Sequence, residues 1–305
     1  MITVLKTAEM LRSIFLSFLL FFAFGITTSD AQSGKLRTQI VEIAKDAKGT
    51  VGVSILNLET RDTLSLNGHA HLPMQSVMKF SIAITVLHEI DKGHFKLDQL
   101  IHIGKSDYYD TYSPLKDKNP VADVDISIRE LLSYMVSLSD NVACDVLIKT
   151  LGGINKVNDY IHSLGVKNIA FKATEFQMAQ AWPVQYTNWA QVTDLTHLLD
   201  ISFNPNFLSA ASHAYLWKIM QETSTGPNQI KGLLPAGTIV YHKTGRSGTN
   251  DKGITAATND IGIITLPNGK HLAIAIFVSD TSVDLQMRES VIARIAKAAF
   301  DNAVK

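Results

Sequence analysis

Ser76 and Lys79, three residues apart in the run MQSVMKF, are the first residues of the sequence that suggest chemistry. Residues at this spacing share one face of a helix, so the lysine amine can reach the serine hydroxyl. A serine is a poor nucleophile without a base, and a desolvated lysine can act as that base or as part of its proton relay. The pair therefore predicts nucleophilic catalysis. A helix-capping serine beside a lysine that extends to solvent is the structural alternative, since this spacing alone is common.

Two further motifs carry polar side chains suited to such a site. Residues 139–141 read SDN, between one predicted helix and the next, and residues 243–245 read KTG, on a predicted strand. Each has an ordinary structural explanation by itself, because Ser and Asp are good N-caps and glycine commonly forms turns. All three motifs in this order, on a helix, a loop and a strand, instead predict one composite site.

The elements that must position these motifs follow from the hydrophobic periodicity. Helical periodicity occurs near both ends of the chain and dominates its middle, at 34–47, 76–91, 127–137, 141–151, 154–164, 190–201, 208–221 and 284–302. Alternation with a period of two predicts strands at 50–60, 62–66, 237–245, 253–267 and 270–280. Two stretches, 104–124 and 172–189, fit neither pattern, and loops of this length in compact proteins are usually functional or disordered.

Strands at both ends of the chain and helices between them predict an α+β fold, an α/β sandwich. We expect the terminal strands to meet in one antiparallel sheet covered by helices, with an all-α domain inserted between them. The α/β domain then comprises residues 32–71 and 231–305, and the all-α domain comprises residues 72–230. The cleft between the two domains is the expected active site.

The N-terminus has the pattern of a secretory signal peptide. Two basic residues precede the apolar run 13–26, and Ser29 and Ala31 are small residues at the spacing that a signal peptidase accepts. We therefore expect residues 1–31 to be removed by cleavage after Ala31, leaving a periplasmic or secreted protein that is not attached to a membrane. The apolar run is short for a membrane span, but an uncleaved anchor is the alternative.

The composition argues against several classes of function. The chain has 28 basic and 28 acidic residues, and a net charge of zero does not suit binding to nucleic acid. Its single cysteine, Cys144, cannot form an intramolecular disulfide and fits an inert buried thiol. His69 and His71 form a His-x-His pair, but no further ligand motif follows. We therefore expect no metal and no organic cofactor.

The three motifs together are the signature of class A β-lactamases and penicillin-binding proteins. The sequence resembles a class A serine β-lactamase over essentially the whole mature chain. The most informative runs, which are similar to the extended-spectrum PER-type and VEB-type branch, are PMQSVMKF, EIDKG, VSLSDNVACD, IMQETSTG and HKTG. The resemblance implies a serine β-lactamase/penicillin-binding-protein-like fold. It also implies resistance through hydrolysis of penicillins and of cephalosporins, including extended-spectrum ones, by a monomer without cofactors.

The same resemblance assigns catalytic roles. Ser76 is expected to be the acylated nucleophile and Lys79 its proton partner. Ser139 is expected to pass a proton to the departing lactam nitrogen, and Lys243 to lower the free-energy cost of that transfer. Glu175, in the unassigned stretch 172–189, is expected to activate the water that hydrolyses the acyl-enzyme, as a general base.

The residues that the resemblance assigns to substrate binding are Tyr112, Asn141, Thr244, Gly245, Arg246 and Lys252. Asn141 is expected to hold the amide side chain of the substrate, and Tyr112 to form an aromatic wall of the cleft. The backbone N–H groups of Ser76 and Arg246 are expected to form the oxyanion hole.

The cation that binds the substrate carboxylate together with Thr244 is left open by the sequence. Many relatives place an arginine shortly before the K-T-G strand, but Gln229 stands there in this chain. We expect either Arg246 or Lys252 to supply the positive charge.

A second departure concerns the hydrolytic water. Ala179 stands four residues after Glu175, where most class A enzymes have an asparagine that helps to hold this water. Gln177, Gln180 and Asn188 are the candidates to replace it. The departure bears on deacylation and not on acylation, because the water enters only in the second step.

Two other functions are compatible with the motifs. A penicillin-binding DD-peptidase would acylate the same serine and stall, and a non-catalytic sensor domain would bind β-lactams without turnover. Glu175 favours the hydrolase, because only a lactamase needs a base for rapid hydrolysis of the ester. The lifetime of the acyl-enzyme distinguishes these three possibilities.

Overall fold

The computed structural model of the chain describes residues 34–304. The predicted signal peptide and its cleavage site lie outside the described residues. None of the helices within 34–304 combines the length and the apolar character needed to cross a membrane.

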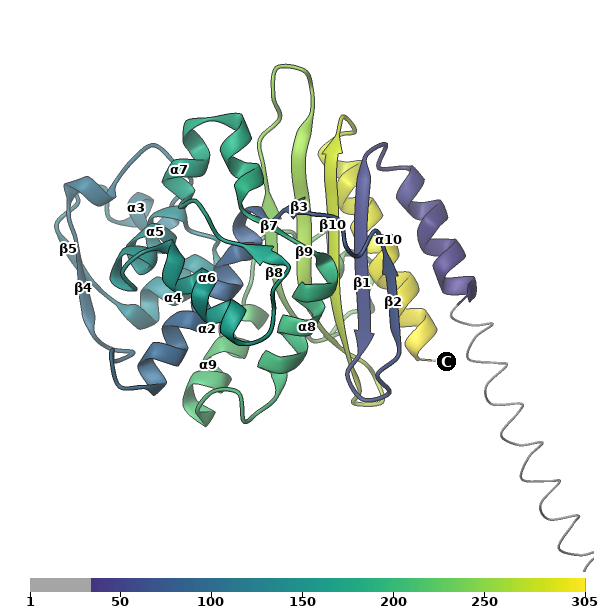
Figure 1. The fold of residues 1–305 in the computed structure, drawn as a ribbon, viewed down its shortest axis with the longest axis horizontal. Coiled ribbons are helices and arrows are strands. Elements are labelled where there is room, and N and C mark those ends of the chain that lie inside the picture. The colour runs from purple at the N-terminus through teal and green to yellow at the C-terminus, as the bar shows by residue number, and fades with distance from the viewer. Residues whose placement is uncertain (1–33, 305) are drawn as a thin grey trace, which may run out of the picture.

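A five-stranded antiparallel sheet forms the centre of one half of the molecule (Figure 1). Its strands, in spatial order, are β2 (Thr63–Leu66), β1 (Thr50–Asn57), β10 (His271–Thr281), β9 (Thr255–Thr265) and β8 (Val240–Arg246). β1 pairs directly with β10 over its full length, with Thr50 opposite Ser279 and Asn57 opposite Leu272. The predicted sheet of N- and C-terminal strands is therefore confirmed, and the KTG motif lies on the edge strand β8.

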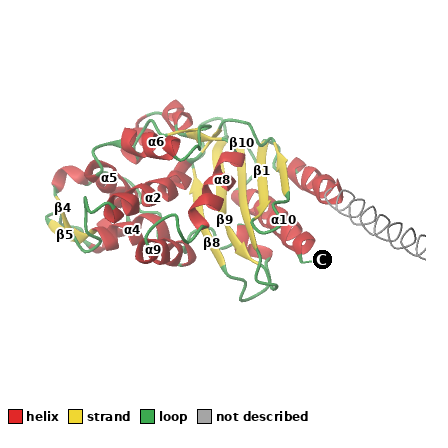
Figure 2. Ribbon diagram, turned by 60° about the horizontal axis from the view of Figure 1, so that its bottom comes forward, coloured by secondary structure: helices red, strands yellow, loops and turns green. Residues whose placement is uncertain are grey.

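Helices cover both faces of this sheet (Figure 2). A helix over residues 34–45 packs with α10 (Leu285–Ala303) on one face, and α8 (Val192–Phe203) packs against β1 and β10 on the other. The alternation along β10 explains this sandwich. Ile274 and Ile276 contribute to the core beneath α10, whereas Ala275 and Phe277 contribute to the core on the side of α8. Successive strand residues point to opposite faces, so a strand that is apolar throughout must be covered twice.

The other half of the molecule is helical (Figures 1 and 2). Its longer helices are α2 (Met78–Asp91), α4 (Ile128–Ser137), α5 (Asn141–Thr150), α6 (Ile154–Ser163) and α9 (Ala210–Gln221). α2 packs against each of the other four and is buried at every position from Met78 to Leu87. A helix that is apolar on all sides is expected at the centre of a bundle. Lys79, the second residue of α2, is therefore anchored in the core of this half.

Several short elements differ from the predicted ones. The α-helix begins at Met78, because residues 75–77 form a separate 3₁₀ turn, η1 (Gln75–Val77). The two unassigned stretches are ordered and contain short elements. Residues 104–124 contain η2 (Lys105–Asp107) and α3 (Pro114–Lys118), and residues 172–189 contain α7 (Glu175–Gln180) and η3 (Trp182–Thr187). The remaining short elements are η4 (Ile230–Leu233), a two-stranded sheet of β4 (Leu100–Ile103) and β5 (Val124–Ser127), and a three-stranded sheet of β3 (Leu72–Pro73), β7 (Trp189–Ala190) and β6 (Ile169–Ala170). Helices of five or six residues fall below the length at which periodicity is informative.

Candidate active site

A cavity of about 340 Å³ opens where the edge strand β8 meets the helical half. Its lining residues are Ser76, Tyr112, Ser139, Asn141, Ser224, Thr225, Gly226, Pro227, Gln229, Thr244, Arg246 and Glu289. Residues from all three predicted motifs are thus brought to one cavity. Gly245 lies within β8, whereas Lys252 lies in the exposed connection between β8 and β9 and is not among the lining residues.

Ser76, the predicted nucleophile, lies in the 3₁₀ turn η1, which β9 and β8 both contact. The amide of Asn259, on β9, donates to the carbonyl oxygens of Pro73 at 2.8 Å and Met74 at 3.2 Å. A Cβ added to Gly245 would lie only 2.5 Å from the Met74 carbonyl oxygen, so only a glycine lets β8 approach this closely. The sheet therefore fixes the backbone that presents Ser76.

The residue before the nucleophile is also constrained. Gln75 is buried and has φ of +51°, a left-handed conformation that is uncommon for residues other than glycine. Its side-chain amide donates to Oε1 of Gln185 at 2.6 Å, a residue in η3. This contact ties the turn that carries Ser76 to the segment that follows α7.

Lys79 is fully buried, and oxygen atoms surround its ammonium group. Its Nζ donates to Ser76 Oγ at 3.0 Å, to the Ser139 carbonyl oxygen at 2.7 Å and to Asn141 Oδ1 at 2.6 Å. It also forms an ion pair with Glu175 Oε1 at 3.0 Å. Such partners are what a buried charge requires, so the desolvation that a lysine would suffer at the start of α2 is offset by the site itself.

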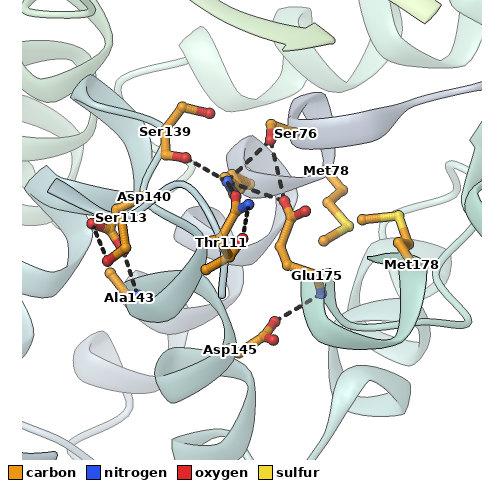
Figure 3. A network of polar contacts seen from close by, with 12 residues as sticks. Ser76, Met78, Thr111, Ser113, Ser139, Asp140, Ala143, Asp145, Glu175 and Met178 are labelled. Carbon is orange, nitrogen blue, oxygen red and sulfur yellow. Dashed lines mark hydrogen bonds and ion pairs between the residues drawn. The ribbon is translucent and has the colours of Figure 1, made fainter. Parts of the chain in front are cut away.

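Ser76 and Glu175 lie in direct contact (Figure 3). The Ser76 hydroxyl donates to Glu175 Oε1 at 3.2 Å, although 99 residues separate the two in the sequence. Glu175 is 7% exposed and is the first residue of α7. The Thr174 hydroxyl caps this short helix by accepting a hydrogen bond from the Gln177 backbone N–H. The Gln177 side-chain Oε1 in turn accepts one from the Thr174 backbone N–H. The capping box explains locally why a helix begins at the glutamate.

Ser139 and Lys243, the second pair of predicted catalytic residues, lie in direct contact. Lys243 is fully buried, and its Nζ donates to Ser139 Oγ at 2.9 Å and to the Thr244 carbonyl oxygen at 2.8 Å. Burial lowers the pKa of Lys243 well below its usual range, and the nearby positive charge of Lys79 lowers it further. A lysine with a depressed pKa releases its proton readily. The pair is therefore suited to deliver a proton through the Ser139 hydroxyl.

The middle residue of the SDN motif is structural. Asp140 is fully buried, and its carboxylate accepts hydrogen bonds from the Ser113 hydroxyl at 2.9 Å and from the backbone N–H groups of Leu115 at 2.7 Å and Ala143 at 2.8 Å. These bonds cap α5 and fix the loop before it (Figure 3). They hold Ser139 at φ of +60°, a strained backbone that costs about 1–3 kcal/mol for a residue with a side chain.

Asp145 was not expected from the sequence, yet it positions Glu175. Its carboxylate accepts the backbone N–H of Glu175 at 2.8 Å, that of Phe176 at 2.9 Å and the Tyr109 hydroxyl at 2.9 Å (Figure 3 draws the first). Burial raises the pKa of Asp145 to about 6. The available signal was an acidic residue one helical turn after Asn141 in the otherwise apolar run VACDVLI.

The three amides proposed to replace the asparagine missing at Ala179 have other partners. Gln177 completes the cap of α7, and Gln180 donates to the Phe176 carbonyl oxygen at 3.2 Å. Asn188 is fully buried and accepts the backbone N–H groups of Lys172 and Ala173 while donating to the Ala173 carbonyl oxygen. Asn188 therefore joins the two ends of the segment 172–189, which carries Glu175.

The hydroxyl groups at the β8 side of the cavity are suited to bind an anion. The hydroxyls of Thr225 and Thr244 lie 2.5 Å apart, and both residues line the cavity together with Arg246. Gln229, which stands where the resemblance would predict an arginine, is buried, and its Oε1 has no hydrogen-bond partner within residues 34–304. Of the two predicted cations, Arg246 is therefore the one that borders the cavity.

The comparison with known proteins agrees with this geometry. A model of the beta-lactamase enzyme family matches residues 35–303. The chain belongs to this family. The β-lactamase is 43% identical to beta-lactamase VEB-1 from Pseudomonas aeruginosa over 281 residues, which are 91% of this chain and 93% of that protein. It is 41% identical to the extended-spectrum beta-lactamase PER-1 from the same organism, covering 95% of this chain and 94% of that protein.

A solved structure with a similar fold is that of the TLA-1 extended-spectrum beta-lactamase. It has a TM-score of 0.88 and 50% sequence identity, covering 90% of this chain and 99% of that one. The motif set and these relatives identify the protein as a class A serine β-lactamase of the predicted fold. It hydrolyses β-lactams and thereby confers resistance. The penicillin-binding and sensor alternatives are not favoured.

Proposed function

We propose that this β-lactamase hydrolyses extended-spectrum cephalosporins and penicillins through an acyl-enzyme on Ser76, which water activated by Glu175 then hydrolyses. The observation that carries the proposal is the position of one carboxylate oxygen. Glu175 Oε1 lies 3.2 Å from Ser76 Oγ and 3.0 Å from Lys79 Nζ. A base within hydrogen-bond reach of the acylated oxygen is what separates rapid turnover from a stalled ester.

In acylation, the Ser76 hydroxyl attacks the lactam carbonyl carbon while its proton passes to Glu175 or to Lys79, both of which it contacts. The backbone N–H groups of Ser76 and Arg246 stabilise the oxyanion, a contribution of about 3–4 kcal/mol per donor. The lactam C–N bond then breaks, and the Ser139 hydroxyl protonates the departing nitrogen. The proton taken from Ser76 passes through Lys79 to restore the Ser139 hydroxyl, so Glu175 is unprotonated again before deacylation. Lys243, whose Nζ donates to Ser139 Oγ, lowers the free-energy cost of this transfer.

In deacylation, Glu175 removes a proton from a water molecule that attacks the ester carbon. The hydroxide equivalent forms the new C–O bond, the Ser76 oxygen leaves, and the proton returns to it. The contacts of Asp145 with the N–H groups of Glu175 and Phe176 support this step by fixing the start of α7.

Substrate recognition is proposed from the lining of the cavity. Asn141 holds the amide side chain of the substrate and Tyr112, which is 58% exposed, forms an aromatic wall. Thr244 and Arg246 bind the carboxylate, and Lys252 is the second candidate for the positive charge. The extended-spectrum preference is carried over from the names of PER-1 and TLA-1.

Further proposals concern the whole molecule. The protein acts as a monomer in the periplasm or outside the cell, after cleavage behind Ala31, and does not bind nucleic acid. It requires no cofactor. The protein has two domains. The α/β domain comprises residues 32–71 and 231–305 and contains every strand of the five-stranded sheet. The all-α domain comprises residues 72–230 and contains helices α2 to α9.

The test is a single-turnover and steady-state assay of residues 32–305 with a chromogenic cephalosporin, read in parallel by intact-protein mass. The wild type is expected to turn over repeatedly with little acyl adduct. Ser76→Ala should abolish turnover, and Glu175→Gln should give one equivalent of product and a persistent adduct. Glu42→Gln, on the exposed face of the helix over residues 34–45, is the matched control. Rapid turnover by Glu175→Gln would contradict the role of Glu175.

A further inference from the structure

Only two of the residues that line the cavity carry a formal charge, and their charges are opposite. Arg246 is contributed by β8, and Glu289 is contributed by α10. The catalytic ions Lys79, Lys243 and Glu175 are buried and do not belong to this lining. An approaching substrate therefore meets a positive and a negative side chain in the lining of one cavity.

The carboxylate of Glu289 forms no ion pair within residues 34–304, and the charge that interacts with it most directly is that of the adjacent Arg288. Its one hydrogen bond comes from the Asn228 side-chain amide, at 3.3 Å. Within residues 34–304 no lysine, arginine or histidine lies within ion-pair distance of it. The adjacent Arg288 is directed elsewhere, because its guanidinium donates to Thr255 Oγ1 and to the Val283 carbonyl oxygen.

This arrangement conflicts with the binding of a purely anionic substrate. The substrate carboxylate is suited to the part of the lining formed by Thr225, Thr244 and Arg246. Glu289, however, repels this carboxylate. A substrate that carries a positive charge next to its carboxylate removes the conflict. In a cephalosporin, the C3 substituent is attached to the ring carbon beside the one that bears the C4 carboxylate. A cation on that substituent is therefore held close to the anion site.

We propose that Glu289 is a specificity-determining residue that favours cephalosporins with a quaternary ammonium or pyridinium group on the C3 substituent over those with a neutral one. The proposal rests on the carboxylate site assigned under the proposed function. Two unit charges on the order of 7 Å apart, at an effective dielectric constant of about 40–80, attract each other by an amount equivalent to about three- to sevenfold in kcat/KM. The preference should weaken as salt screens the two charges.

The experiment uses two cephalosporins with the same C7 side chain that differ only at C3, one with an N-methylpyrrolidinium-methyl group and one with an acetoxymethyl group. The ratio of their kcat/KM values is measured for the wild type, for Glu289→Gln and for the control Glu42→Gln. Glutamine keeps the shape of Glu289 and can still accept the bond from Asn228, so the charge is the only intended change.

The expected result is that Glu289→Gln lowers the ratio about three- to sevenfold and removes its salt dependence, while Glu42→Gln leaves both unchanged. An unchanged ratio overturns the proposal. Equal gains for both substrates would mean that Glu289 only repels the shared carboxylate, and equal losses would mean a structural role. If the wild type hydrolyses neither cephalosporin, the proposed function fails first, so the two failures are distinguishable.

Discussion

Substituting Gly245 by alanine should move Ser76, the proposed nucleophile, away from β8, the strand that carries the Arg246 N–H proposed for the oxyanion hole. The new Cβ would lie 2.5 Å from the Met74 carbonyl oxygen and 3.0 Å from the Val77 backbone nitrogen. Both obstacles are backbone atoms in or beside η1, so neither can rotate away. Reaching an ordinary contact distance requires β8 and η1 to move apart by about 0.7–0.9 Å.

This displacement acts on the part of the site where geometry matters most. Misplacing reacting groups by about 1 Å can cost about 100-fold in rate, and we expect a loss of that size in the acylation rate of Gly245→Ala. Overpacking should also destabilise the fold by about 1–3 kcal/mol. Stopped-flow single-turnover kinetics with a chromogenic cephalosporin measure the first effect, and urea unfolding measures the second.

Gly248→Ala is the control, because a Cβ at Gly248 meets no atom within 4 Å and the residue lies only three positions further along the chain. It should acylate like the wild type. If Gly245→Ala also acylates within a few fold of the wild type, the close packing of β8 on η1 is not what aligns Ser76, and the reasoning is wrong.

Four other substitutions test three separate parts of the structure. Burial raises the pKa of Asp145 to about 6, so the folded protein binds a proton at this carboxyl group more tightly than the unfolded chain does. The folded state therefore loses up to about 3 kcal/mol of stability as pH rises from about 4 to about 6. In Asp145→Asn this contribution is absent, so the melting temperature should vary less over that pH range. Asn188→Ala leaves the Lys172 and Ala173 backbone groups unpaired and should cost about 2–4 kcal/mol in urea unfolding. Arg246→Gln should raise the KM for cephalosporins about tenfold while Lys252→Gln does not, since only Arg246 lines the cavity.

Each of these has a clear contrary result. A melting temperature of Asp145→Asn that follows the wild type across the pH range would show that this carboxyl group does not titrate there. An unchanged unfolding midpoint for Asn188→Ala would show that the segment 172–189 is held by other contacts. A larger effect of Lys252→Gln on KM would transfer the carboxylate site to the connection between β8 and β9.

The sequence by itself determined the chemistry and the main architecture. The three motifs singled out Ser76, Lys79, Ser139 and Lys243 as candidate catalytic residues, because the proposed roles depend on residue type and on short spacing. The change from period two to helical periodicity and back predicted a sheet made from both chain ends, which the pairing of β1 with β10 confirmed. Both inferences use interactions between residues close in sequence, which local patterns record.

Only the tertiary structure decided how the site is assembled. The contact of Glu175 with Ser76, the close approach of Gly245 to Met74 and the support of α7 by Asp145 all join segments far apart in the chain. Their distances depend on how the sheet packs against α2 and α5, which no local pattern encodes. The same holds for the charges of the cavity, since Glu289 on α10 reaches it only because the last helix of the chain covers the sheet beside β8.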